Sequence, residues 1–182
     1  MLAWNESMLS KSQPFAGILI ATGAFLAAAA PSFAQTDIKA AVLAHLKTSR
    51  EFTLKVADQM PEASYNFKLT PPQMSFAEQM VHLAQAQAEF VAPVSGERPN
   101  PGKPASMNKK DVIEFVRSSF DHSIEKVSKL TNEQLAKTYS GGEGTMTGFE
   151  MLLAMLDHTT HHRASAEMYL RAKGITPADY QF

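Results

Sequence analysis

A helix-start signal that recurs along the chain places the strongest constraint on its fold. A serine or threonine stands three residues before a glutamate or glutamine where three helical segments would start: Ser75 and Glu78, Thr131 and Gln134, Thr147 and Glu150. The two side chains of such a capping box bind backbone N–H groups that the first turn of a helix leaves without partners. The pattern predicts a helix start at each place, with only a short helical turn after Thr131.

Apolar residues at helical spacing extend these signals into four long amphipathic helices. We expect them at about 38–60, from Ser75 to just before Pro93, at about 108–130, and from Thr147 to Lys173. The expected core face of the first helix consists of Ile38, Val42, Leu46, Thr53, Val56 and Met60, with Ser49 as a polar exception. That of the second consists of Phe76, Met80, Leu83, Ala86 and Phe90. That of the third consists of Ile113, Val116, Phe120, Ile124 and Val127. Pro61 ends the first helix, and Gly174 followed by Pro177 ends the last.

The stretches between the helices predict loops rather than a sheet. Residues 95–106 are rich in proline and glycine, a composition that resists both helix and strand. A glycine-rich break at 141–144 precedes the last helix. Residues 63–70 could form a short extended piece, but no stretch alternates strictly between flanking hairpin turns. We therefore predict an all-α protein, an up-down four-helix bundle with one long crossover loop.

Residues 1–34 differ from the rest and have the pattern of a secretory signal peptide. Lys11 precedes an uncharged apolar run, and small residues stand at Ser32 and Ala34, where a signal peptidase requires them. We predict cleavage after Ala34, one mature domain at 35–182, and a periplasmic or secreted location with no stable membrane anchor. One alternative is an uncleaved anchor, although the apolar run falls short of the roughly 20 residues that span a bilayer. A separate alternative is that translation starts at Met8 in place of Met1.

Composition narrows the partners and the possible metal ligands. The chain has 17 lysines and arginines against 18 aspartates and glutamates. It therefore lacks the basic excess that draws proteins onto phosphate backbones, and we expect no nucleic-acid partner. Cysteine is absent, which excludes disulfides, thiolate ligands and a cysteine nucleophile. Any strong metal ligand must offer nitrogen or oxygen.

Histidine spacing gives the candidate functional residues. His158 and His162 stand four apart inside the last predicted helix, so both project from the face that also carries Met155. His82, on the second helix beside the inward Leu83, is the candidate for a third ligand from a facing helix. A pair at this spacing is often incidental, and a lone histidine beside apolar neighbours is usually a core residue. Spacing alone leaves both interpretations open.

The other three histidines are weaker candidates for metal ligands. His161 is turned by roughly 60° from His158 about the helix axis, so it could support the ligands or lie on the surface. His45 borders the core face of the first helix and is interpreted as structural. His122 lies off the apolar stripe and is expected in solvent. No residue is an evident general base, because Glu78 is expected to cap its helix.

Three segments carry a resemblance to a known family. They are residues 75–84 (SFAEQMVHLA), 157–163 (DHTTHHR) and 169–180 (YLRAKGITPADY). Together they are similar to the DinB-like, or DNA-damage-inducible, superfamily of metal-binding four-helix bundles, which includes the bacillithiol and mycothiol transferases. In that family one histidine of the second helix and two of a His-x3-His pair hold a divalent metal. The resemblance thus implies that His82, His158 and His162 bind Zn²⁺, Ni²⁺, Mn²⁺ or Fe²⁺.

The same resemblance sets the functional expectation. It implies a metal-dependent transferase or hydrolase, of unknown substrate, whose thiol would come from a cofactor. Many members continue with Arg-Gly-Gln after the second motif histidine, whereas this chain has Arg163-Ala164-Ser165, which keeps the ligands and changes their neighbours. Export argues against thiol transfer, because small thiols are kept reduced mainly inside cells. The alternative is a non-catalytic metal-binding or stress-response bundle.

The resemblance also suggests a homodimer. Many members pair through helix faces, and an apolar patch could come from four residues that the expected bundle leaves over: Phe52, Leu54, Leu152 and Leu153.

Overall fold

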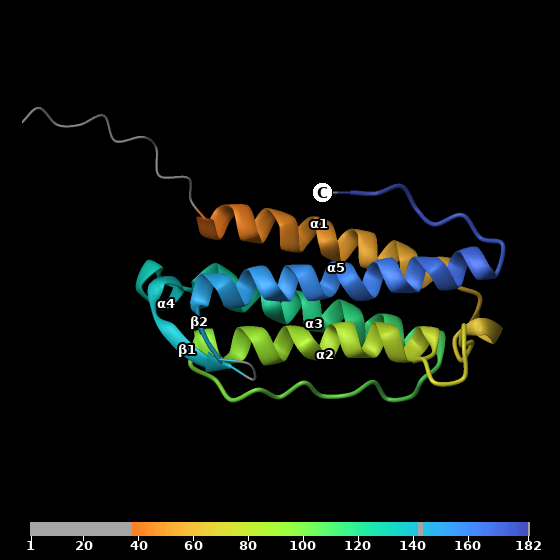
Figure 1. Cartoon of the computed structure of the whole chain (residues 1–182), viewed down its shortest axis with the longest axis horizontal. Coiled ribbons are helices and arrows are strands. Elements are labelled where there is room, and N and C mark those ends of the chain that lie inside the picture. Colours follow the sequence, from red (N-terminus) through yellow and green to blue (C-terminus); the bar gives the residue numbers. More distant parts are fainter. Residues whose placement is uncertain (1–37, 142–143, 182) are drawn as a thin grey trace, which may run out of the picture. The chain divides into compact units, whose positions relative to one another are not determined.

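The computed structural model describes residues 38–141 and 144–181, which are mainly helical (Figure 1). The elements are α1 (Ile38–Gln59), the 3₁₀ turn η1 (Glu62–Ser64), α2 (Phe76–Ser95), α3 (Lys109–Lys129), α4 (Asn132–Ala136), β1 (Thr138–Gly141), β2 (Gly144–Thr147) and α5 (Gly148–Ala172). The predicted signal peptide, its cleavage after Ala34 and the two possible starts lie outside the described residues. Within those residues, no helix combines the length and apolarity needed to cross a membrane.

The four long helices pack side by side, which confirms the predicted helical bundle (Figure 1). α2 packs against α3 and α5, and α1 packs against the same two helices. The loop at 96–108 carries the chain back along the bundle, so α2 and α3 run in one direction and α1 and α5 in the other. An ion pair between Lys109 and Asp58 joins the start of α3 to the end of α1. Another, between Lys126 and Glu97, lies where α2 and α3 both end.

Capping boxes begin the helices as predicted. The backbone N–H of Glu78 donates to Oγ of Ser75 at 3.2 Å, and the backbone N–H of Ser75 donates to the Glu78 carboxylate at 2.6 Å. The same reciprocal bonds form at Thr131 and Gln134 before α4, and at Thr147 and Glu150 before α5. After α5, Gly174 takes the left-handed conformation with φ 73°, which is the stop that the sequence predicts.

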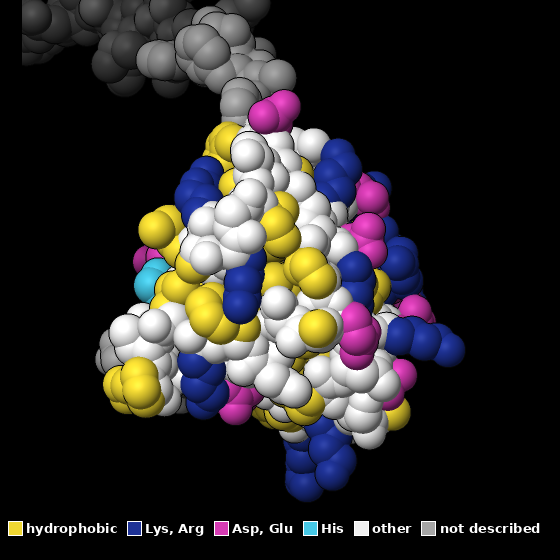
Figure 2. All heavy atoms as spheres, turned by 90° about the vertical axis from the view of Figure 1, so that its right-hand side faces the viewer, with side chains coloured by type: hydrophobic (Ala, Val, Ile, Leu, Met, Phe, Trp, Pro, Cys, Tyr) yellow, Lys and Arg dark blue, Asp and Glu magenta, His cyan; other side chains and the backbone are white. Residues whose placement is uncertain are grey.

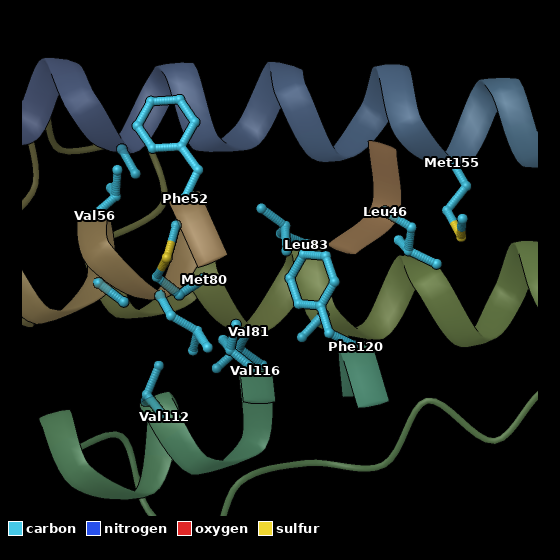
Figure 3. Packing of buried hydrophobic residues seen from close by; sticks show 14 of the residues in the cluster. Leu46, Phe52, Val56, Met80, Val81, Leu83, Val112, Val116, Phe120 and Met155 are labelled. Carbon is cyan, nitrogen blue, oxygen red and sulfur yellow. The ribbon is translucent and has the colours of Figure 1, made fainter. Parts of the chain in front are cut away.

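Much of the core lies on the predicted faces, although Figure 3 also shows the buried Phe52, Val81 and Val112, which the prediction left out. The fully buried side chains from the predicted faces are Leu46, Val56, Met60, Phe76, Met80, Leu83, Val116, Phe120 and Val127. Burial of one such side chain contributes about 1.5–3 kcal/mol relative to exposure. Ile38, at the start of α1, is exposed, and Phe90, Ile113 and Ile124 are half-buried. Met151 and Met155 are buried packing residues on α5.

The prediction of no sheet is wrong, because β1 and β2 form a short antiparallel hairpin between α4 and α5. Tyr139 lies opposite Met146, and Gly141 opposite Gly144. Each strand has four residues, which is too short for alternation to show in the sequence, and the glycines suggested only a break. The Tyr139 hydroxyl donates to the carbonyl of Gln134 at 3.1 Å and ties the hairpin to α4. Residues 63–70 form a 3₁₀ turn and loop, not a strand.

α2 also runs past Pro93, where the sequence predicted that it would stop. Val94 is 1% exposed, so the extra turn adds an apolar side chain to the core and offsets the backbone hydrogen bond that proline removes. The helix ends at Ser95, where Gly96 takes a left-handed conformation with φ 80°. The N–H of Glu97 then donates to the carbonyl of Ala92 at 2.8 Å, as in a Schellman motif.

Three of the four residues expected to form an apolar dimer patch are buried, so that prediction is wrong. Phe52 and Leu152 are fully buried in their own bundle, and Leu54 is 8% exposed. Leu153 alone of the four is exposed, so these residues form no continuous surface. The end of the bundle seen in Figure 2 mixes lysine and arginine with aspartate and glutamate rather than collecting one sign. The homodimer itself stays a prediction.

Candidate metal centre

Three histidines meet between α2 and α5. His82 comes from α2, and His158 and His162 come from consecutive turns of α5. The ring centroids of His158 and His162 are 4.4 Å apart. The ring centroid of His82 lies 5.0 Å from that of His158 and 4.5 Å from that of His162. One ring nitrogen from each residue lies within 4.8 Å of the other two. The sequence therefore identified the three side chains that the fold brings together.

The cluster fits a divalent cation by its donor atoms. A tetrahedral ion bound at about 2.0–2.1 Å holds its nitrogen ligands roughly 3.4 Å apart, so the rings would draw together on binding. Nδ1 of His158 is buried and has no hydrogen-bond partner among the described residues. An unsatisfied buried nitrogen costs about 1–3 kcal/mol, and coordination of an ion through that atom would remove the cost.

Gln79 fixes the orientation of one ring. Nδ1 of His162 lies 2.6 Å from Oε1 of Gln79, one turn before His82 on α2. An amide oxygen can only accept, so Nδ1 of His162 carries the proton and its Nε2 keeps a free lone pair. Such a hydrogen bond from the second ring nitrogen is the usual support of a metal-binding histidine. Sequence reasoning missed this role, although the spacing between Gln79 and His82 indicates a shared helix face.

Burial favours the neutral form of two of the three rings. Burial, together with the neighbouring His158 and His82, lowers the pKa of His162 to about 4. Burial also lowers the pKa of His158, again with a contribution from His82. Neutral imidazole is the form that binds metal, so at neutral pH these two rings need not lose a proton first.

The other titratable groups lie outside the cluster. His161 is exposed on α5, with its ring centroid 4.9 Å from that of His162. His122 is exposed as predicted. The structural role predicted for His45 is wrong, because its side chain on α1 is exposed. Glu78 is held as a helix cap, and the backbone N–H of Ser75 lowers its pKa. This carboxylate is therefore not a free base.

Shallow hollows reach the cluster from two sides. One, about 480 Å³ in volume, is lined by Phe90, Asp157, His158 and His161 among others. The second, about 240 Å³, includes His82 and Gln85. A similar hollow of about 510 Å³ lies away from the histidines, between α2, the crossover loop and α3. The histidines are thus open to small molecules without being fully solvated.

Comparison with known proteins agrees with this architecture. The sequence matches the model of the DinB family over residues 34–182. A crystal structure of a DinB-like protein from Bacillus subtilis superimposes with a TM-score of 0.67 at 20% identity, covering 77% of this chain and 96% of that one. A DinB-like protein from Bacillus cereus gives 0.68 at 17% identity, covering 77% and 95%. The sequence matches none of the curated proteins with which it was compared.

Proposed function

The chain belongs to the DinB family, and from this premise we propose that it is an exported metalloprotein in which His82, His158 and His162 bind one divalent cation. The single observation that supports the proposal is the convergence of three ring nitrogens within 4.8 Å from two helices. The ion is Zn²⁺, Ni²⁺, Mn²⁺ or Fe²⁺, because nitrogen ligands suit these ions and the chain has no cysteine to favour softer ones.

We further propose that the bound metal serves a transferase or hydrolase reaction. An ion held by three neutral imidazoles keeps its double charge and open positions, and so supplies Lewis-acid polarisation. The protein positions a substrate beside it in the hollow lined by His158, where Phe90 packs against the ring with centroids 6.0 Å apart. Asp157 and His161 line the same hollow and are the groups there that can exchange a proton with a substrate.

Metal titration tests the first proposal. The purified protein should retain close to one equivalent of a divalent ion by elemental analysis. Replacing any one of the three histidines by alanine should remove most of the affinity, because two imidazoles do not fill a coordination sphere. His122→Ala, an exposed residue on α3, is the matched control and should bind as the wild type does. Only traces of each ion in the wild type, or three alanine variants that bind normally, would refute the site.

A non-catalytic role is the second candidate, and one observation favours it. Glu78, one turn before His82 on α2, is occupied as a helix cap and not available as a base. Cobalt substitution separates the two roles. If the site is catalytic, adding a small thiol should produce a sulfur-to-cobalt absorption band, because an open position accepts the ligand. A cobalt spectrum that no added ligand alters would show a closed, structural site.

A further inference from the structure

Arg163 is a buried cation on the side of α5 that faces α1, whereas the metal cluster lies on the side that faces α2. It follows His162 in sequence, but its side chain packs against α1 and is 3% exposed. Nη1 donates to Oγ of Ser49 at 2.8 Å, and the guanidinium carbon lies 4.5 Å from the centre of the Phe52 ring. Nη2 makes a longer bond, 3.4 Å, to Oγ1 of Thr160. Both hydrogen-bond acceptors are neutral hydroxyls.

No acidic residue in the described part of the chain pairs directly with this arginine: burial lowers the pKa of Arg163, and the negative charge of the nearby Glu167 only partly opposes that effect. No carboxylate of residues 38–141 or 144–181 lies within 4.0 Å of its guanidinium nitrogens. Glu167, one turn further along α5, forms its ion pair with Arg171 at 3.7 Å. Nε of Arg163 is buried and has no hydrogen-bond partner among the described residues. Because a buried charge without a directly paired counter-ion is strongly unfavourable, this arrangement favours an anion that the described residues do not supply.

A hollow beside Arg163 offers room for such an anion. Its volume is about 130 Å³, whereas one ordered water needs about 10–15 Å³ of such space. Besides Arg163, the polar side chains of its lining include His45, Thr48, Thr160, Tyr180 and Gln181. Each of these side-chain types can donate a hydrogen bond, and none of the described residues that line the hollow is acidic. The lining thus suits a small negatively charged ligand.

We propose that this hollow binds a carboxylate, either a free small ion or the carboxylate group of a larger molecule. The planar guanidinium presents parallel N–H groups that match the two oxygens of a carboxylate, a geometry that lysine cannot offer. Phe52 holds the plane of the guanidinium on one side, and Ser49 fixes Nη1. The site stands independently of the metal, because none of its lining residues belongs to the three-histidine cluster.

Acetate and its neutral analogue acetamide test the proposal directly. Metal is first removed with a chelator, and the chelator is then dialysed away, because its own carboxylates would compete for the hollow. The titrations are done at neutral pH and fixed ionic strength, so that the histidine cluster does not contribute. Acetate should shift the side-chain Nε–H resonance of Arg163 in a saturable way and raise the Tm by about 2–4 °C near saturation. Acetamide should do neither. Equal effects of acetate and acetamide on the wild type would overturn the proposal.

Substitutions locate the effect. Arg163→Gln should abolish the acetate-dependent rise in Tm. Arg163→Lys should weaken the apparent affinity for acetate at least tenfold, because the paired N–H donors of the guanidinium are lost while the positive charge remains. Arg117→Gln, an exposed arginine on α3, is the matched control and should respond as the wild type does. A full acetate response in Arg163→Gln would refute the assignment. A larger carboxylate such as benzoate distinguishes the two sources, since binding of acetate but not benzoate indicates a site for free small ions.

Ser49→Asp gives a test that does not depend on removing the arginine. Oγ of Ser49 already lies 2.8 Å from Nη1, so an aspartate there supplies an internal carboxylate. This variant should have a higher Tm than the wild type without acetate and should no longer respond to acetate. A variant that is folded, less stable and still responsive would show that Arg163 does not lack a counter-ion.

Discussion

Burial of His162 favours metal binding but lowers the stability of the fold in acid. Its burial lowers the pKa to about 4, which keeps the ring neutral and ready to bind an ion. In the unfolded chain the same ring has a pKa of about 6.5. Burial therefore prepares the site at a cost in stability under acidic conditions.

This difference predicts how the metal-free protein responds to pH. Between about 6.5 and 4 the unfolded chain binds a proton at His162 that the folded chain does not, so acid favours unfolding. The contribution of His162 to stability should be constant above about pH 6.5 and should fall as the pH drops towards 4. Urea midpoints in chelator should show a smaller fall for His162→Gln, with some dependence left from His158. His122→Gln should keep the wild-type fall; an unchanged fall in His162→Gln would contradict the pKa assignment.

Gln79 provides a second prediction at this scale. Gln79→Leu removes the acceptor for Nδ1 of His162 and should weaken metal binding about tenfold to a hundredfold, as loss of such supporting bonds does elsewhere. Gln79→Glu keeps an acceptor oxygen and should retain or strengthen binding. Isothermal titration with Zn²⁺ measures both. Equal loss in the two variants would mean that Gln79 acts by packing and not by orienting the ring.

Residue spacing identified the histidines but not their supports, for a physical reason. His158 and His162 share a face because of the geometry of one helix, which the sequence contains. The bond between Gln79 and His162 depends on how far α2 is shifted along α5, and no single-helix pattern specifies that shift. His45 was misplaced for a similar reason, since a residue at the border of a face is decided by the neighbouring helix.

At the scale of elements, local chemistry predicted the helix starts and tertiary burial decided the ends. The capping boxes act within four residues, so the sequence alone determines them. α2 continues past Pro93 because Val94 is buried, a fact that depends on the rest of the bundle. The hairpin likewise went unpredicted because its strands are short and its glycines also fit a plain loop.

Gly148 gives a test of the close packing between α4 and α5. A Cβ at this position would lie 2.4 Å from the carbonyl oxygen of Gln134 and 2.9 Å from a methyl group of Val94. Gly148→Ala should therefore displace backbone and cost about 1–3 kcal/mol or more of unfolding free energy. Gly174→Ala is the matched control: it has open space around it and should cost about 1 kcal/mol, through its positive φ alone. Equal urea midpoints for the two variants would contradict the close approach.

At the scale of the whole molecule, the crossover loop determines which helices can share a site. Because residues 96–108 return the chain along the bundle, α3 runs parallel to α2, and α5 then runs antiparallel to α2. α2 and α5 pack side by side along the bundle, so His82 meets His158 and His162 where the two helices face each other. The sequence predicted an up-down bundle with one long loop, but it did not specify which helices face each other.

Export is the last prediction, and it concerns the whole chain. A signal peptidase requires small side chains at the last and third-last positions of the signal, here Ala34 and Ser32, while the position between them is unconstrained. Expressed with export, the protein should begin at Gln35 by mass spectrometry. It should also lack tryptophan fluorescence, because Trp4 is the only tryptophan in the sequence.

Ala34→Asp should block cleavage and leave Trp4 on the protein, whereas Phe33→Leu, at the unconstrained position, should be processed normally. If both variants and the wild type keep Trp4, residues 1–34 are not removed. The uncleaved anchor would then be supported if the protein remains with the membrane fraction in carbonate, and export itself would be contradicted if the protein stays in the cytoplasm.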